Sequence, residues 1–148
     1  MKKVIFRTLP AAILFVAAIV VMGGCVKKEN KNPLVNTEWK LINFVDVGNN
    51  TKKTPEPDNE KCYTLKFLKK GDSLTTTSST NNFTGIYIID TQKLYVSFKE
   101  LVGTEINEIG DGNLYVKSLN IIDKYTIDKD VLKLYYNDNK NYLEFKRR

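Results

Sequence analysis

The 148-residue chain contains no histidine and only two cysteines, Cys25 and Cys62. Without an imidazole side chain it has no histidine general base, no Ser-His or Cys-His pair and no histidine metal ligand. It also has neither a glycine-rich phosphate loop nor the regular acidic spacing of a calcium loop. We therefore predict a protein that is not an enzyme, with no catalytic residues, no bound metal and no cofactor.

A basic segment followed by a short apolar run opens the chain. Three basic side chains and no acid precede residue 9, and the fourteen residues 9–22 are all apolar or proline. This order is typical of a secretory signal peptide. The run is shorter than the about 20 apolar residues of a membrane-spanning helix, but the uncharged stretch 8–26 is longer and keeps a retained membrane helix as the alternative. We predict a signal peptide over residues 1–24.

The signal peptide leads into Met22-Gly23-Gly24-Cys25. This tetrapeptide resembles the bacterial lipobox, in which a large aliphatic residue and two small residues precede a cysteine. The resemblance implies that the Cys25 thiol carries a diacylglycerol and that cleavage leaves Cys25 as the first residue. Two or more acyl chains anchor a protein far more firmly than one. We predict a lipid-anchored protein of the bacterial cell envelope, with the outer membrane favoured and its periplasmic or surface face left open.

Loss of the signal peptide changes the charge and the cysteine count. The leader takes three of the 23 basic residues and no acid, which leaves 20 basic against 17 acidic residues and a net charge of +3. So small a charge is ordinary for a soluble domain and gives no reason to expect a nucleic-acid partner. With Cys25 lipidated, Cys62 has no disulfide partner. We predict that Cys62 is a small core residue of a strand, and an exposed reactive thiol is the alternative.

The mature chain divides into a lipidated, flexible tether, residues 25–35, and a folded domain, residues 36–148. The tether is mostly polar and has no hydrophobic period. Beyond it, alternating apolar residues predict strands near residues 39–45, 63–67, 83–89, 94–98, 125–127, 132–136 and 142–145. We expect the strand at 83–89 to be covered on both faces. The threonine-rich segment 73–80 indicates a solvated edge strand or a mobile hairpin arm, and residues 51–60 a surface loop.

A helical period replaces the alternation over residues 111–119, with Asp111 placed to cap the amino end. The fold class is therefore mainly β (α+β), an antiparallel sheet or partial barrel of about seven or eight strands with one short helix. Four acidic residues gather before and at the start of the helix: Glu100, Glu105, Glu108 and Asp111. We interpret them as a solvated acidic loop, because their spacing is not that of a cation site.

Several segments, taken in order, resemble the META domain of small bacterial envelope proteins. They are Thr37-Glu38-Trp39-Lys40-Leu41, Asn81-Asn82-Phe83-Thr84-Gly85-Ile86-Tyr87, Leu94-Tyr95-Val96-Ser97, and the closing pair Tyr125–Asp128 and Leu132–Tyr136. The resemblance implies an accessory, interaction or envelope-stress role with no defined ligand. Within its central segment we expect Gly85 to mark a bulge or a close approach, and Tyr87 to bury its ring while its hydroxyl finds a partner.

Three tyrosines of the closing strands, Tyr135, Tyr136 and Tyr142, form a candidate interaction patch together with neighbouring lysines. Such amphipathic side chains suit an envelope protein or glycan as partner. Ordinary packing of tyrosine within a sheet is the alternative. A second candidate function is a lipocalin-like carrier, in which the sheet closes around an apolar cavity that holds a small ligand.

Overall fold

The computed structural model describes residues 31–148, so the predicted signal peptide and the predicted lipidation at Cys25 lie outside the described residues. The described part forms nine strands and one helix. In chain order they are β1 (Thr37–Asp46), β2 (Thr51–Lys53), β3 (Thr64–Phe67), β4 (Ser73–Thr77), β5 (Asn82–Asp90), β6 (Tyr95–Gly103), α1 (Gly112–Leu119), β7 (Lys124–Asp128), β8 (Val131–Tyr136) and β9 (Asn141–Arg147).

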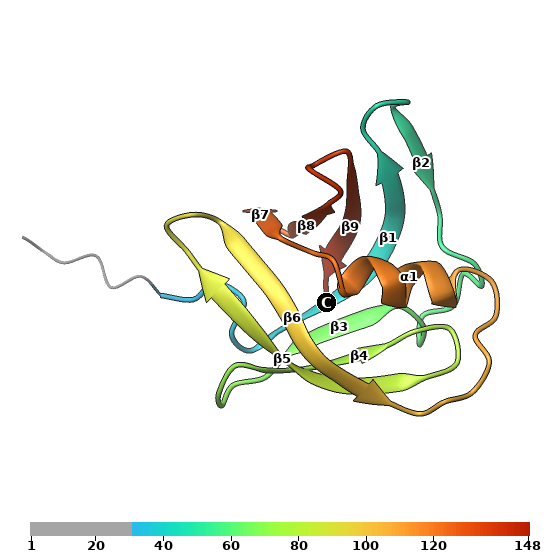
Figure 1. Ribbon diagram of the computed structural model, residues 1–148, viewed down its shortest axis with the longest axis horizontal. Helices are drawn as coiled ribbons and strands as arrows, with labels where there is room; N and C mark the ends of the chain where they lie inside the picture. The colour runs from blue at the N-terminus through green and yellow to red at the C-terminus, as the bar shows by residue number, and fades with distance from the viewer. Residues whose placement is uncertain (1–30) are drawn as a thin grey trace, which may run out of the picture.

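All strand pairs are antiparallel, and the sheet has the order β6-β5-β4-β3-β1-β9-β8-β7, with β2 paired to β1. The sheet curls so that its two edge strands approach each other, as Figure 1 shows. They meet near Leu94, whose carbonyl accepts a hydrogen bond of 2.9 Å from the amide of Tyr125. The predicted mainly β fold, an antiparallel partial barrel with one short helix, is confirmed.

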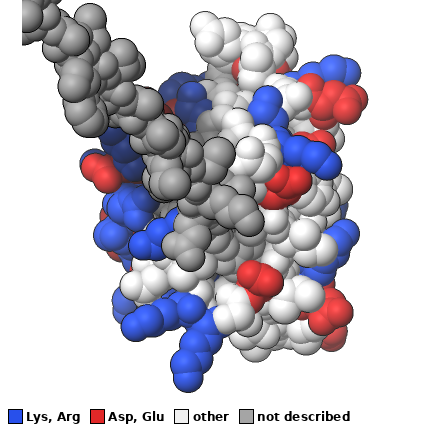
Figure 2. Space-filling view, turned by 90° about the vertical axis from the view of Figure 1, so that its left-hand side faces the viewer, with Lys and Arg blue, Asp and Glu red and all other residues white. Residues whose placement is uncertain are grey.

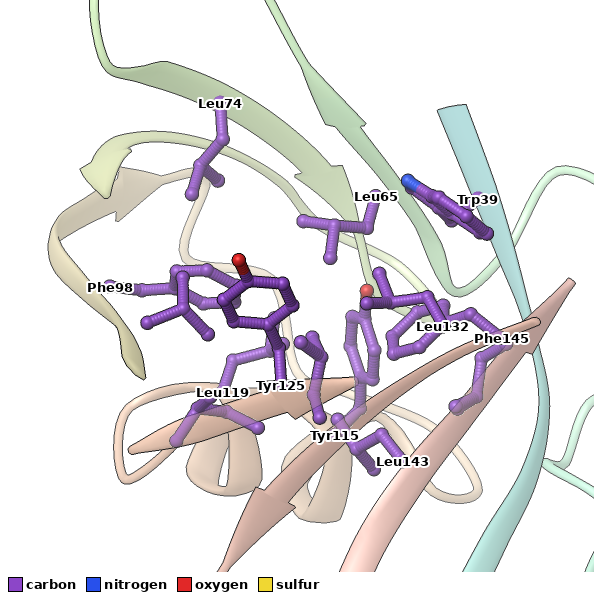
Figure 3. Close-up of a cluster of buried hydrophobic side chains, with 14 of the residues drawn as sticks. Trp39, Leu65, Leu74, Phe98, Tyr115, Leu119, Tyr125, Leu132, Leu143 and Phe145 are labelled. Carbon is purple, nitrogen blue, oxygen red and sulfur yellow. The ribbon is translucent and has the colours of Figure 1, made fainter. Parts of the chain in front are cut away.

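The concave side of the sheet and the helix enclose one core. Tyr63, Leu65 and Phe67 share a face as predicted, and all three are fully buried. From α1, Tyr115 and Leu119 point into the core (Figure 3), and Tyr115 contacts Thr64 of β3, Thr76 of β4 and Phe145 of β9. Aromatic side chains that fill this interior make edge contacts, with 5.4 Å between the ring centres of Tyr63 and Tyr115. Burial of such large side chains is the main stabilising contribution in a domain of this size.

The threonine-rich segment is an inner strand, so the prediction of an edge strand or mobile arm is wrong. β4 lies between β3 and β5, and Leu74 and Thr76 on its inner face are buried. The Thr76 hydroxyl donates to the carbonyl of Thr64 at 2.7 Å and lies 2.7 Å from the Tyr115 hydroxyl. A threonine satisfied in this way can occupy a core position, because its hydroxyl is not left without a partner.

β5 differs from the prediction on one face. Its inner residue Tyr87 is buried, but Ile86 and Ile88 on the outer face are 40% and 51% exposed, so the strand is not covered on both sides. Gly85 marks a bulge as predicted, since the β5–β6 register shifts between Thr84 and Ile86. A Cβ atom at Gly85 would lie 2.9 Å from the Lys99 carbonyl oxygen, which explains why a glycine is found there.

The folded body includes residues from the segment predicted to be a tether. Leu34 is fully buried in the core, and the Asn32 side-chain amide donates to the Tyr87 hydroxyl at 2.9 Å. This hydrogen bond also supplies the partner expected for Tyr87. The loop predicted over residues 51–60 begins with a short strand, β2, which extends the β1 hairpin. The structure therefore fixes the chain to the body from Asn32 onward.

Candidate interaction surface

Two of the three predicted tyrosines come together on the outer face of the closing strands. Tyr135 of β8 lies directly opposite Tyr142 of β9, and their ring centres are 5.2 Å apart. Both side chains are half-buried. Directly opposed aromatic residues on antiparallel strands stabilise the pairing. The pairing of β8 with β9 thus brings Tyr135 and Tyr142 of the predicted patch into contact.

Two lysines lie over these rings. The Lys124 ammonium is 5.2 Å from the centre of the Tyr135 ring, and the Lys133 ammonium is 5.0 Å from the centre of the Tyr142 ring. Both distances fall within the range of cation–π attraction, which holds a lysine over an aromatic face. We call Tyr135, Tyr142, Lys124 and Lys133 the tyrosine–lysine surface. It offers aromatic area and positive charge in one place.

Tyr136 does not belong to this surface, and its inclusion in the predicted patch is wrong. It is buried on the inner face of β8. Successive side chains of a strand point to opposite faces, so Tyr136 shares a face with Leu132 and Leu134, while Tyr135 points outward. Opposite Tyr136 on β9 is Asn141.

An acidic residue borders the surface. Glu144 of β9 lies opposite Lys133, and its carboxylate is 3.0 Å from the Lys52 ammonium and accepts 2.7 Å from the Asn43 amide. Burial raises the pKa of Glu144, but the hydrogen bonds from Asn43 and Lys52 lower it more, and the net shift is downward. Glu144 therefore remains ionised and compensates part of the local positive charge.

A groove adjoins the tyrosine–lysine surface where the two edges of the sheet meet. It has a volume of about 740 Å³ and shares Lys124 with that surface. Its lining residues are Ile88, Asp90, Lys93, Tyr95, Asp123 and Lys124. Aspartates and lysines occur in equal numbers in this lining, so the groove itself carries no net charge.

The predicted solvated acidic loop is wrong for Glu108. Its carboxylate accepts hydrogen bonds from the hydroxyls of Ser78, Ser79 and Thr80, from the Thr80 amide and from the Asn81 side chain. Burial raises the pKa of Glu108, but the hydrogen bonds from these donors lower it by more, and the resulting pKa is about 2. The contacts attach the segment before α1 to the β4–β5 turn, so the Glu108 carboxylate stabilises the fold in its ionised form.

Asp111 is also buried, against the same prediction. It stands at the N-cap position of α1, but its side chain makes no cap hydrogen bond. One carboxylate oxygen lies 2.5 Å from the Lys53 ammonium, and the other accepts 2.8 Å from the Glu56 amide. The Asp111 side chain thus joins the loop after β2 to the start of α1. Because both carboxylate oxygens are used in these contacts, Asp111 does not cap the helix.

Cys62 and Lys40 are two buried side chains with nucleophilic atoms. The Cys62 thiol donates to the Ser79 carbonyl at 3.5 Å and precedes β3, so the residue is in the core, as predicted, but not within a strand. The Lys40 ammonium lies 5.6 Å from the centre of the Tyr63 ring. Burial lowers the pKa of Lys40, against the attraction of Glu60 and Asp58. Neither group faces one of the grooves described for residues 31–148.

Over residues 31–148 no group of three or more Cys, Asp or Glu side chains has an arrangement that could hold a metal ion. In that same part of the chain the one helix, α1, does not have the length and apolar character needed to span a bilayer.

Comparison with known proteins places these features in a wider context. No protein-family model matches the chain. A protein of Tannerella forsythia named "Putative lipoprotein" is 27% identical over an alignment of 149 positions, which covers 99% of this chain and 97% of that protein. The similarity therefore extends through nearly the whole chain, including most of the residues before the folded domain.

Two solved structures share the fold. A protein from Burkholderia xenovorans, determined by NMR, has a TM-score of 0.63 and 23% identity, covering 78% of this chain and 83% of its own. A DUF4847 family protein from Bacteroides vulgatus has a TM-score of 0.59 and 16% identity, covering 77% and 94%. At these identities the similarity shows a common architecture and no common activity.

Proposed function

We propose that this chain is a lipoprotein of the bacterial cell envelope, exported by residues 1–24 and anchored in the outer membrane by acyl chains on Cys25. The observation that carries the proposal is the lipobox-like Met22–Cys25 in a chain that matches a "Putative lipoprotein" over 99% of its length. Small residues before the cysteine suit the peptidase that exposes it, and two acyl chains are sufficient for stable anchoring.

We also propose that the folded domain is META-like and non-catalytic, and that it binds an envelope protein or glycan through the tyrosine–lysine surface. The contact of the Tyr135 and Tyr142 rings, with a lysine ammonium over each, supports this role, because tyrosines are enriched at interfaces and charged groups around them contribute to the choice of partner. The strongly shifted groups support the non-catalytic role: Glu108 and Tyr115 are each held in contacts that join elements of the fold.

A small-ligand carrier is the second candidate, favoured by the curled sheet. A carrier needs an apolar interior that is partly empty. Here the interior contains Trp39, Tyr63 and Phe145, all fully buried, and the groove of about 740 Å³ opens at the outside of the sheet. This filled interior favours the interaction role over the carrier.

Photo-crosslinking in intact cells tests the binding surface. A photoreactive phenylalanine analogue replaces Tyr135, and the matched control places it at Val47, an exposed residue in the β1–β2 turn. We expect a discrete crosslinked product from position 135 and none from position 47. That product should disappear when Lys124 and Lys133 are both changed to glutamate. Equal products from both positions, or none from position 135, would contradict this role for the tyrosine–lysine surface.

A further inference from the structure

The chain leaves the folded body beside the β5–β6 hairpin. The first described residues run next to this hairpin at the left of Figure 1, and Asn32 is bonded there to Tyr87 of β5. Leu34, two residues later, is locked in the core. The point from which the N-terminal segment extends toward Cys25 is therefore fixed relative to the fold.

The length of that segment limits where the membrane can be. Six peptide units separate Cys25 from Lys31, and an extended chain spans at most about 3.6 Å per residue, so the two are no more than about 22 Å apart. β1 runs from this end of the molecule to the β1–β2 turn, and its ten residues span about 33 Å. An anchor at Cys25 thus keeps Lys31 close to the lipid, while the β1–β2 turn lies at the far end of β1.

The hairpin near this exit carries exposed apolar side chains. Ile88 is 51% exposed, Leu94 43% and Tyr95 37%. Ile88 and Tyr95 face the same groove as Lys93 and Lys124. Isoleucine, leucine and tyrosine side chains enter the boundary between headgroups and acyl chains, and lysines keep their charge in water while their stems lie along apolar surface. We call Ile88, Leu94 and Tyr95 the hairpin surface.

Charge does not oppose contact with lipid at this place. Asp90 is 3.8 Å from the Lys93 ammonium, and Asp123 is accompanied by Lys124 in the groove lining. Figure 2 turns the same end of the molecule toward the viewer and shows basic and acidic side chains interspersed around it. Because no excess of acidic side chains faces the headgroups, burial of apolar area is not cancelled by repulsion.

We propose that the hairpin surface rests against the same lipid bilayer that holds the acyl chains, so that the lipoprotein sits on the membrane in one orientation. This inference depends on the proposed lipid anchor at Cys25. It assigns a membrane-contacting role to exposed side chains of β5, β6 and the turn between them. In this orientation the β1–β2 turn points away from the bilayer.

Tryptophan quenching by brominated lipids tests the orientation. The intact lipoprotein, purified with its acyl chains, is placed in vesicles of phosphatidylethanolamine and phosphatidylglycerol that contain bromine-labelled acyl chains. Trp39, the only native tryptophan, is fully buried and provides a constant background. The variants Ile88→Trp and Val47→Trp place a second tryptophan on the hairpin and on the far turn. Mass spectrometry of each preparation establishes whether Cys25 is acylated.

We expect the brominated lipids to quench Ile88→Trp and not Val47→Trp, since interfacial side chains enter by about 5–10 Å. Equal quenching of both, or of neither, in an acylated protein overturns the membrane contact and leaves the anchor intact. A blue-shifted but unquenched Ile88→Trp also overturns it, because protein and not lipid would then cover the hairpin. An unacylated Cys25 in the mass spectrum overturns the proposed anchor, and the orientation with it.

Discussion

At the residue scale, Glu108 is the clearest case of an ionised group that stabilises the fold. Five donors from the β4–β5 turn surround its carboxylate. Its pKa is lowered from 4.5 to about 2. A lowered folded-state pKa means that the ionised group contributes stability above pH 4.5, and that this contribution is lost as the pH falls toward about 2.

We predict that Glu108→Gln lowers the free energy of unfolding at about pH 7 by about 1–2 kcal/mol, a value reduced for solvent screening of a half-buried group. The loss should shrink as the pH falls from 4.5 toward about 2, because the Glu108 carboxyl then takes up a proton in the unfolded chain while it is still ionised in the folded protein, and this protonation stabilises the unfolded wild type. Urea denaturation at several pH values measures it, with the exposed Glu105→Gln as control. A loss that is the same at every pH would contradict the assignment to the ionised carboxylate.

Single residues were predictable where strand alternation decides their environment. The alternating pattern of β3 placed Tyr63, Leu65 and Phe67 in the core correctly. Glu108 and Asp111 were not predictable, because their partners are 27 to 58 residues away in the sequence and are brought near only by the folded chain. The polar composition of the segment therefore predicted, wrongly, that Glu108 and Asp111 are exposed to solvent. The same alternation, applied strictly to β8, would have excluded Tyr136 from the patch.

At the scale of elements, the segment before β1 acts as part of the fold. Leu34 is fully buried, whereas its neighbour Val35 is 36% exposed. A buried leucine at the edge of a polar segment gives no periodic signal, since periodicity needs several turns or alternations to be visible. For that reason the sequence predicted a tether up to residue 35, and the structure shows an attachment that begins at Asn32.

We predict that Leu34→Ala destabilises the domain by about 2–4 kcal/mol, the cost of emptying a core position. Val35→Ala, one residue later, should cost less than about 1 kcal/mol because its side chain is partly in solvent. Thermal unfolding of the two variants beside the wild type provides the comparison. Equal, small losses for both would mean that the N-terminal segment is not part of the cooperative unit.

The strand elements were predicted better than their places in the sheet. The alternating segments became β1, β3, β5, β6, β7, β8 and β9, and the helical period became α1. The inner position of β4 was missed because its threonines read as solvent-facing, while the hydroxyl of Thr76 is in fact satisfied by Thr64 and Tyr115. Tertiary hydrogen bonds overrode the polar composition there.

At the scale of the whole molecule, β1 pairs with β9, so the first long strand and the last lie side by side in the middle of the sheet. As a result β6 and β7 are the two edge strands of the sheet, and these edges meet near Leu94. The fold class followed from the sequence, whereas the strand order depends on contacts between distant residues. Large side chains, among them Trp39, Tyr63 and Phe145, fill the interior of the curled sheet.

The central claim is that Cys25 anchors this domain to a membrane, and changing that cysteine tests it most directly. We predict that Cys25→Ala abolishes incorporation of a labelled fatty acid and moves the protein from the membrane fraction to the soluble fraction. Cys62→Ala is the matched control, because it removes the other cysteine and should leave both label and membrane association unchanged. Continued acylation of Cys25→Ala, or its retention in the membrane fraction, would contradict the account.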